Sequence, residues 1–278
     1  MNKGMVKKRF FTAAGVLACL ALCILWLAPF GWVLSTSMRQ RSEAFSVPPA
    51  FWPEQLNFAN YLNVFRAIPI MKFMGNSLYI AIFTTALMLL VTCMAAYSMA
   101  RISFHGKKLL MPLLLSGMMI PSSVTLIPLF FTMRDLGLIN NRWSVILLGI
   151  YYPMGFLLIR QFYMTIPKSY DEAAYMDGAG HIRIFFSVIL PMSVSSLIVA
   201  GLLCFIGSWN NFLLPLILLS NVNEFTIPLG MQFLLGSFST DICLILAAVV
   251  IALIPPVLLF ITCQRWLLQG MITTGLKS

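Results

Sequence analysis

The chain has 278 residues, of which 60% are hydrophobic and only 9% are charged, and its formal net charge is +10. A charged fraction this low excludes an ordinary water-soluble domain, in which about a quarter of the residues are charged. The composition predicts an all-α polytopic membrane protein, with residues 1–278 forming one transmembrane domain.

Six apolar stretches are long enough to predict six transmembrane helices, since a span needs about 20 apolar residues. They lie at roughly 10–35, 73–99, 109–133, 143–163, 191–219 and 242–266. The first follows Lys3, Lys7, Lys8 and Arg9 and continues through Trp32 without a small-residue cleavage site. It therefore predicts a retained span rather than a cleaved signal peptide.

Basic residues are distributed unevenly between the two sides that six spans would create. Twelve of the 18 lie at the termini, in the 100–108 loop and in or beside the loop at 167–191, and six lie on the other side. The positive-inside rule places both termini and these two loops in the cytoplasm. The positive charge therefore reflects membrane topology and gives no reason to expect nucleic-acid binding.

The first loop on the outer side, residues 36–72, is too polar and too rich in proline to span a membrane. Within it, Leu56–Phe65 has helical apolar spacing at Phe58, Tyr61, Leu62 and Phe65. One interpretation is a helix on the outer membrane surface, anchored by Trp52 and Tyr61, and the sequence favours it. The other is a docking surface for an external partner.

The third apolar stretch contains prolines and hydroxyl side chains together, at Pro112, Pro121, Pro128, Ser122, Ser123 and Thr125. Proline frees backbone carbonyls, which a membrane tolerates only where protein or a water-filled cavity satisfies them. The stretch predicts a broken helix that lines a pathway, with Ser122 and Ser123 as candidate substrate-pathway residues. The alternative is a kink packed against neighbouring helices.

The loop at 167–191, called the central loop below, has strong helix signals. Ser169 and Glu172 have the spacing of a capping box, and Gly178 suits a left-handed C-terminal cap, which together predict a helix over Tyr170–Asp177. A second helix is expected from near Gly180 to Leu190. Pro191 would then open the next apolar span as a first-turn proline.

The central loop also carries a family resemblance. Glu172-Ala173-Ala174, three residues, Gly178, nine residues and Val188-Ile189-Leu190-Pro191 resembles the EAA loop of binding-protein-dependent ABC importer permeases, with Val188 as the one departure. The resemblance implies that this loop docks into a cleft on a cytoplasmic ATPase. The residues that would couple the chain to that ATPase are Tyr170, Glu172, Ala173, Ala174, Asp177, Gly178, Leu190 and Pro191.

The fifth apolar stretch contains Trp209, Asn210 and Asn211. Asparagines within a membrane span are costly unless partnered and are functional candidates, and an aromatic ring beside amides suits a sugar. The alternative is that the amides bind kinked backbone near Pro215. The stretch from Trp209 to Leu216 is similar to the second permease subunit of carbohydrate importers, the class of the maltose and glycerol-phosphate systems, although members often carry an acid where Asn211 stands.

This resemblance implies the type I ABC importer permease fold in a multi-pass protein of a bacterial or archaeal cytoplasmic membrane. The implied partners are a second, heterologous permease, two ABC ATPase subunits and an extracytoplasmic solute-binding protein that delivers a carbohydrate. ATP and Mg²⁺ would be bound by the ATPase, because this chain has no Gly-x-x-x-x-Gly-Lys-[Ser/Thr] motif.

Other function classes fit the sequence less well. Neither histidine, His105 or His181, lies near an acid cluster, and the six cysteines form no Cys-x-x-Cys pair, so the chain is expected to hold no metal, no cofactor and no catalytic residue. The cysteines are expected to be small buried side chains. A secondary transporter would need ionisable groups near mid-span, which the sequence lacks. An ABC permease for a non-sugar solute is the remaining alternative.

Overall fold

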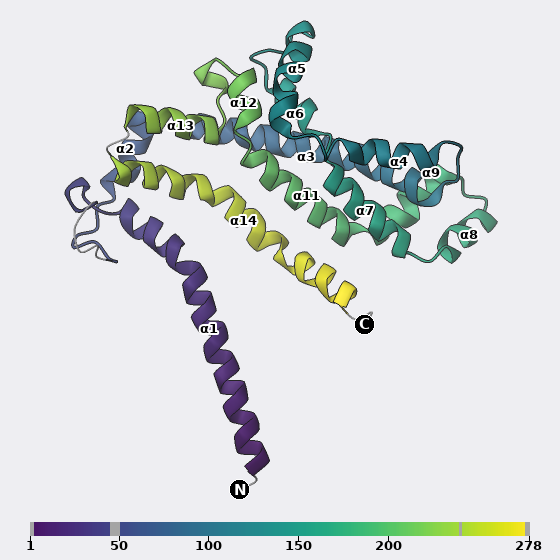
Figure 1. Cartoon of the computed structure of the whole chain (residues 1–278), viewed down its shortest axis with the longest axis horizontal. Helices are drawn as coiled ribbons and strands as arrows, with labels where there is room; N and C mark the ends of the chain where they lie inside the picture. The colour runs from purple at the N-terminus through teal and green to yellow at the C-terminus, as the bar shows by residue number, and fades with distance from the viewer. Residues whose placement is uncertain (1–2, 45–50, 239–240, 276–278) are drawn as a thin grey trace. The chain divides into compact units, whose positions relative to one another are not determined.

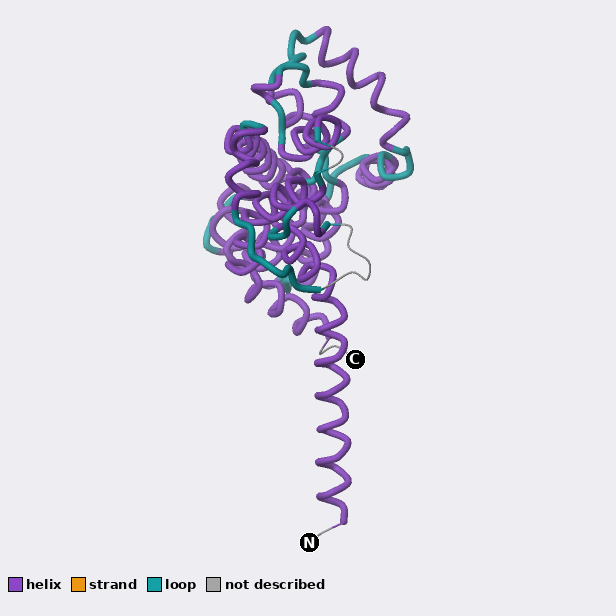
Figure 2. The backbone as a smooth tube through the Cα atoms, turned by 90° about the vertical axis from the view of Figure 1, so that its left-hand side faces the viewer, coloured by secondary structure: helices purple, strands orange, loops and turns teal. Residues whose placement is uncertain are grey.

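The computed structural model describes residues 3–44, 51–238 and 241–275, and Figure 2 shows helices joined by loops, with no strand in this part of the chain. The all-α class is therefore confirmed. In chain order the helices are α1 (Lys3–Ser37), η1 (Arg41–Glu43), α2 (Ala59–Ala67), α3 (Ile70–Arg101), α4 (Lys107–Ser116), α5 (Ser122–Asp135), α6 (Arg142–Gly149), α7 (Pro153–Thr165), α8 (Ser169–Met176), α9 (His181–Ile184), η2 (Phe185–Ile189), α10 (Leu190–Met192), α11 (Val194–Trp209), α12 (Leu213–Leu218), η3 (Val222–Glu224), α13 (Ile227–Ser237) and α14 (Ile242–Gly275).

The chain divides into two compact units. The first contains Met1–Pro69 and Phe233–Ala252, and the second contains Ile70–Gln232 and Leu253–Ser278. The single transmembrane domain proposed for residues 1–278 stays a prediction.

Within the described residues, three single helices are long and apolar enough to cross a bilayer: Thr12–Ser37, Ile70–Arg101 and Ile242–Trp266. Two further candidates are bent helix pairs, α6 with α7 at 41° and His181–Met192 with α11 at 79°. The remaining stretch, 109–133, is divided between α4 and α5. The break near its prolines agrees with the sequence, whereas the count of six spans stays a prediction.

In the first unit, α2 packs against the end of α1 through a face that the sequence did not predict. The side-chain amide of Asn60 donates to the carbonyl oxygens of Ser37 at 2.9 Å and Arg39 at 2.8 Å. Asn60 and Val64 are the buried residues of α2. Three of the four predicted face residues are exposed instead: Phe58, Leu62 and Phe65. An exposed apolar face is what a helix on the membrane surface would present, so that interpretation stays a prediction. Asn60 attaches the opposite face of α2 to α1 by satisfying carbonyls at the C-terminal end of α1, which have no partner within that helix.

The second unit is built around α3, which packs against α6, α7 and α11, as Figure 1 shows for α7 and α11. Its buried residues recur at three- and four-residue intervals and many are small, including Ser77, Ala81, Thr84, Thr92 and Ala96. Small side chains let helices approach closely inside a membrane. The long uninterrupted α3 is therefore the element against which the shorter helices of this unit are placed.

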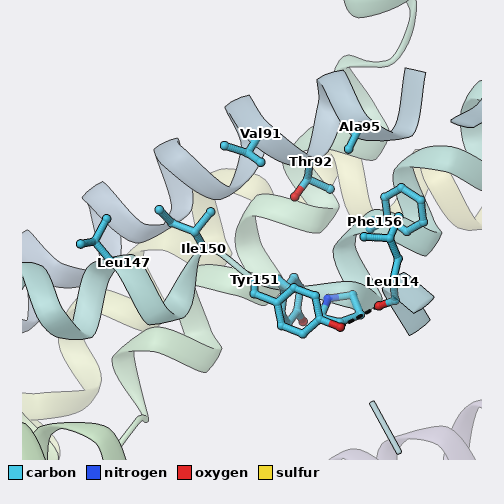
Figure 3. Close-up of a pocket in the computed structure, with 10 residues that line it drawn as sticks. Val91, Thr92, Ala95, Leu114, Leu147, Ile150, Tyr151 and Phe156 are labelled. Carbon is cyan, nitrogen blue, oxygen red and sulfur yellow. Dashed lines mark hydrogen bonds between the residues drawn. The ribbon is translucent and has the colours of Figure 1, made fainter. Parts of the chain in front are cut away.

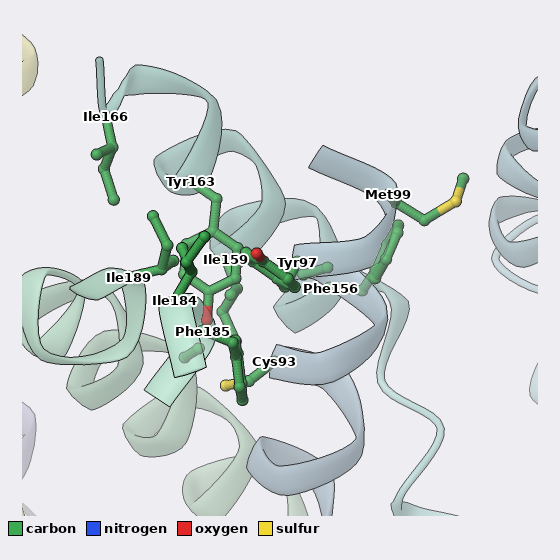
Figure 4. Packing of buried hydrophobic residues seen from close by; sticks show 12 residues of the cluster. Cys93, Tyr97, Met99, Phe156, Ile159, Tyr163, Ile166, Ile184, Phe185 and Ile189 are labelled. Carbon is green, nitrogen blue, oxygen red and sulfur yellow. The ribbon is translucent and has the colours of Figure 1, made fainter. Parts of the chain in front are cut away.

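A hydrophobic cluster, called the end cluster below, lies where the last turns of α3 meet α7 and the 184–189 segment (Figure 4). The rings of Tyr97 on α3 and Phe185 have centroids 5.2 Å apart, and Tyr163 of α7 is fully buried beside them. Aromatic side chains bury large apolar areas, so this cluster fixes both ends of the central loop to the helices.

The cysteines are free and only half of them are well buried. Cys93, Cys204 and Cys243 are buried, whereas Cys19 and Cys23 are exposed on α1 and Cys263 is intermediate. The expectation of burial was wrong for Cys19 and Cys23, because the apolar side chains of α1 point outward, as Leu17 and Trp26 also do.

Candidate functional site

The candidate site is centred on α8, which begins one residue earlier than the capping-box prediction required. Lys168 occupies the N-cap position and makes no side-chain cap hydrogen bond. Ser169 is already in the first turn, and the Glu172 amide donates to the Lys168 carbonyl at 3.0 Å. The predicted Ser169–Glu172 box is therefore wrong, because a side-chain cap needs a non-helical N-cap residue.

The C-terminal end of α8 forms as predicted. Gly178 has a φ of +75°, and its amide donates to the Tyr175 carbonyl at 2.9 Å. The Ala179 amide donates to the Ala174 carbonyl at 2.9 Å, which completes a Schellman motif. Asp177 is the C-cap residue, so the predicted range Tyr170–Asp177 is displaced by one residue from the observed helix. Gly178 turns the chain sharply towards α9.

The two faces of α8 differ in burial. Asp171 is buried and Ala174 packs against the end cluster. The opposite face presents exposed side chains to the surroundings: Tyr170, Glu172, Ala173, Tyr175, Met176 and Asp177. Met176 is 89% exposed. The small residues Ala173 and Ala174 therefore lie on different faces of α8. Ala174 allows α8 to pack closely against the end cluster, whereas Ala173 lies on the exposed face.

An ion pair holds the inner face of α8. The Arg101 guanidinium, at the last residue of α3, lies 3.1 Å from an Asp171 carboxylate oxygen, and their side chains are only 6% and 13% exposed. The same guanidinium donates to the carbonyl oxygen of Ile166 at 2.7 Å. The sequence did not identify either residue as functional, although Arg101 is the one charged residue in the last turn of a long apolar helix.

The return path from α8 runs through a π-helical turn. The Tyr175 hydroxyl lies 2.6 Å from Nδ1 of His181 across the Gly178 turn. The π-helical turn η2 then precedes Leu190 and Pro191, and the Leu190 amide bonds to the Phe185 carbonyl. A proline ring clashes with the carbonyl four residues earlier, which a wider turn relieves.

Pro191 lies in the first turn of α10, as predicted, but α10 does not by itself open the next apolar span. Pro191 continues the 181–192 helix, which bends by 79° before α11 begins at Val194. Leu190 is half-buried and packs against the end cluster.

The polar residues of the fifth stretch lie at a helix break. Trp209 ends α11, is 3% exposed and stacks on Phe205 with a 6.1 Å centroid distance. Asn210 is the exposed C-cap of α11. The Asn211 side-chain oxygen accepts the Leu214 amide at 3.3 Å in the first turn of α12. This geometry supports the interpretation in which Asn211 binds kinked backbone near Pro215.

Ser122 and Ser123 begin α5 after Pro121, and both are exposed. The Thr125 hydroxyl donates to the Ser122 carbonyl at 2.9 Å, which is a local helix contact. Among the described residues, no hydrogen bond or ion pair joins these serines to Trp209, Asn210 or Asn211, although α5 and α12 pack against each other. The structure thus places the five candidate pathway residues at two separate helix breaks.

A cavity of about 290 Å³ in the second unit lies at a different break, between α6 and α7 (Figure 3). Its polar side chains are Thr92, Tyr151 and Tyr152, and its other lining residues are Val91, Ala95, Leu114, Leu147, Ile150, Pro153 and Phe156. The Tyr151 hydroxyl donates to the Leu114 carbonyl at 2.6 Å. The sequence missed this site, but the Tyr151-Tyr152-Pro153 run inside an apolar stretch was a usable signal, because proline forces a helix to start anew.

Known proteins are similar to this chain over most of its length. A family described as binding-protein-dependent transport system inner membrane component matches residues 92–273. The chain is 32% identical over 265 residues to the sulfoquinovosyl glycerol transport system permease protein SmoH of Agrobacterium fabrum, covering 94% of this chain and 93% of the relative. It is 35% identical to the arabinooligosaccharides transport system permease protein AraQ of Halalkalibacterium halodurans, covering 82% of each. Its fold is similar to that of a chain in a bacterial ABC transporter involved in alginate import, with a TM-score of 0.79, 22% identity and coverage of 93% and 97%.

Proposed function

The chain belongs to the family of binding-protein-dependent transport system inner membrane components, and on that premise we propose that it is the transmembrane subunit of an ATP-driven importer for a carbohydrate, either a sugar or an oligosaccharide. The proposed partners are a second, heterologous permease, two ABC ATPase subunits and an extracytoplasmic binding protein. Both termini and the central loop lie in the cytoplasm of a bacterial or archaeal cell, in agreement with the positive-inside rule.

The observation that carries this proposal is the two-sided burial of α8. Its inner face is fixed by Asp171 and Ala174, while its outer face leaves Tyr170, Ala173 and Met176 uncovered. A short helix with a small residue between two large exposed side chains suits insertion into a cleft. Ala173 allows close approach, and the Tyr170 and Met176 side chains supply apolar contact area.

The acidic residues of α8 extend the same docking surface. Glu172 and Asp177 are exposed beside Ala173 and Met176, so they are available to basic residues of a partner. Charged groups at the rim of an interface chiefly set the association rate and the choice of partner. Glu172 and Asp177 are accordingly proposed to orient α8 in the ATPase cleft rather than to supply most of the affinity.

In the proposed cycle, ATP and Mg²⁺ are bound by the ATPase subunits and this chain performs no chemistry. Closure of the ATPase dimer displaces α8, and the packed helices move between an inward-open and an outward-open state. Hydrolysis resets them. ATP drives the change because it binds the two states of the assembly with different affinity.

A carbohydrate is the proposed cargo because the similar permeases SmoH and AraQ are named for a sugar glycoside and for arabinooligosaccharides. The cavity at the α6–α7 break adds a physical argument. It combines aromatic rings with hydroxyl groups at Tyr151, Tyr152 and Thr92. The break between α6 and α7 also leaves backbone amide and carbonyl groups without helical partners there. Sugar rings are recognised by stacking and hydrogen bonding. The cavity is therefore a better candidate for the substrate pathway than the region around Trp209, whose ring already stacks on Phe205.

Affinity purification from native membranes in mild detergent tests the proposed assembly. An affinity-tagged chain should recover an ABC ATPase and a second permease in comparable amounts, identified by mass spectrometry. The binding protein encoded with them should then bind a sugar in calorimetric titration. Recovery of the chain alone or as a homo-oligomer from membranes that take up the solute without ATP would overturn the proposal.

A further inference from the structure

Three segments meet at one buried guanidinium. Arg101 ends α3, and it contacts the Asp171 carboxylate of α8 at 3.1 Å and the carbonyl oxygen of Ile166, the residue after α7, at 2.7 Å. The side chains of the two charged residues are 6% and 13% exposed. A buried charge whose partner is removed is left uncompensated, so each member of this pair depends strongly on the other.

The other attachments of α8 are the apolar packing of Ala174 against the end cluster and contacts at the two ends of the helix. Its N-terminal end follows Pro167 and has no side-chain cap. Its C-terminal end leads through the positive-φ Gly178 into α9, and the Tyr175–His181 contact there is exposed. Among the described residues, the Asp171–Arg101 pair is the buried polar contact that joins an α8 side chain to a long helix.

The long helix that receives this contact also reaches the cavity. Val91, Thr92 and Ala95 of α3 line it. Ala95 is six residues before Arg101, which corresponds to about 9 Å along a helix at 1.5 Å rise per residue. No proline interrupts α3 between these positions. A force applied at Arg101 is therefore carried to the cavity by one continuous helix.

We propose that Arg101 and Asp171 are a positioning pair that locks α8 onto the end of α3, so that displacement of α8 by the ATPase moves the cavity wall through α3. This inference rests on the proposed function. The Arg101–Asp171 ion pair would then transmit the motion of α8 to α3. This pair lies outside the Glu-Ala-Ala and glycine pattern of the central loop. The docking face of α8 is separate from it, because Tyr170, Ala173 and Met176 point away from the buried side.

The first test uses Asp171→Asn, which keeps the shape of the side chain and removes its charge. The full transporter is reconstituted in proteoliposomes with its binding protein, and the ratio of solute imported to ATP hydrolysed is measured. We expect the ATPase to co-purify in wild-type amounts, with the ratio reduced about tenfold. Lys108→Gln is the matched control, because it removes an exposed charge seven residues after Arg101, and it should leave the ratio unchanged. An unchanged ratio in Asp171→Asn would overturn the inference.

A charge reversal separates a positioning role from a merely structural one. Arg101→Glu should lower the ratio, and the double variant Arg101→Glu/Asp171→Arg should raise it at least about fivefold above that single variant. The recovery should be incomplete, because a glutamate cannot donate to the Ile166 carbonyl. A double variant no better than Arg101→Glu would contradict the pairing.

A covalent bridge provides a test that does not depend on the charged variants folding well. Arg101→Cys/Asp171→Cys is made in a background in which the six native cysteines are replaced, and a short bis-maleimide spacer then joins the two positions. If α8 and α3 move together, bridging should restore uptake relative to the unbridged double variant. Loss of uptake, or no change, would show that the two helices move independently and would overturn the inference.

Failure of the inference is distinguishable from failure of the proposed function. If the wild-type assembly shows no ATP-dependent uptake, the importer proposal itself fails. If the wild type couples ATP hydrolysis to uptake and the variants above couple equally well, only the positioning pair fails.

Discussion

The phenol hydroxyl of Tyr151 donates a 2.6 Å hydrogen bond to the backbone carbonyl oxygen of Leu114. Leu114 lies in the last turns of α4, and Tyr151 lies between α6 and α7. The bond therefore joins the interruption of the third apolar stretch to that of the fourth, beside the cavity in Figure 3. The Leu114 carbonyl is one of the C-terminal helix carbonyls that lack a partner in their own helix.

Replacing Tyr151 with Phe should destabilise the protein, because the Leu114 carbonyl loses its donor while the ring remains. The expected loss is about 1 kcal/mol, the usual net value of one intramolecular hydrogen bond. Thermal unfolding in detergent measures it, with Tyr170→Phe on the exposed face of α8 as the control. Equal melting temperatures for Tyr151→Phe and the control would contradict this role.

A side chain at Gly117 should destabilise the protein while Tyr151 is present. A Cβ at Gly117 would overlap the Tyr151 ring and hydroxyl. Gly117→Ala should therefore destabilise the protein by about 1–3 kcal/mol, as overpacking does. The same change in a Tyr151→Ala background should cost less, because the ring is gone. A double-mutant cycle of unfolding free energies checks this, and strict additivity would refute the steric account.

Ala173 and Ala174 should respond oppositely to enlargement. Ala173→Leu adds volume on the open face and should leave the unfolding free energy within about 0.5 kcal/mol of wild type. It should nevertheless reduce the amount of ATPase that co-purifies. Ala174→Leu adds volume against the end cluster and should destabilise the protein by about 1–3 kcal/mol. If Ala173→Leu retained full ATPase recovery, the proposed docking face would be wrong.

Gly178 should be needed for its backbone conformation and not for space. Nothing lies within 4 Å of a Cβ built there, and its φ is +75°. Gly178→Val should cost about 1–2 kcal/mol for the left-handed conformation. Gly178→Asn should cost less, because asparagine tolerates that region. Import per ATP hydrolysed should fall in the same order, and a Val variant that couples as well as the Asn variant would argue against a rigid turn.

Asn140 should stabilise the second unit through both its backbone and its side chain. Its φ is +60°, its amide donates to the Leu218 carbonyl at 2.7 Å, and its side-chain oxygen accepts the amides of Ser220 at 3.1 Å and Asn221 at 2.9 Å. Asn140→Gly keeps the backbone conformation and should lose about 1–3 kcal/mol, the net value of two hydrogen bonds. Asn140→Ala should lose more, since it adds strain. Chemical denaturation ranks the variants, and an alanine variant as stable as the glycine variant would exclude the strain term.

Local signals in the sequence predicted the features that depend on local chemistry. Gly178 was expected to take a left-handed conformation because it follows a helix-forming run, and the Schellman motif there agrees. The break in the third stretch was expected from its prolines. The capping box failed although its spacing was correct, because α8 begins one residue earlier and Ser169 is helical. A shift of one residue in the helix start changes which side chain can cap the helix.

Features that join distant residues could not be read from the sequence. Arg101 and Asp171 are 70 positions apart in the chain, and no periodicity relates them. The inward face of α2 was missed because Asn60 satisfies carbonyls of another segment, and the apolar pattern gives no sign of that contact. The π-helical turn before Pro191 likewise depends on how the 181–192 helix is held by the end cluster.

The most direct measurement of the central claim is ATP-dependent solute uptake by the reconstituted transporter, comparing wild type with Ala173→Leu. The chain is reconstituted with the second permease and ATPase that co-purify with it, and with the binding protein loaded with its sugar. The account predicts uptake that requires ATP and the ATPase subunits in the wild type, and uptake that is strongly reduced in the variant while the variant stays folded. Uptake that continues without ATP or without the ATPase subunits would contradict the account.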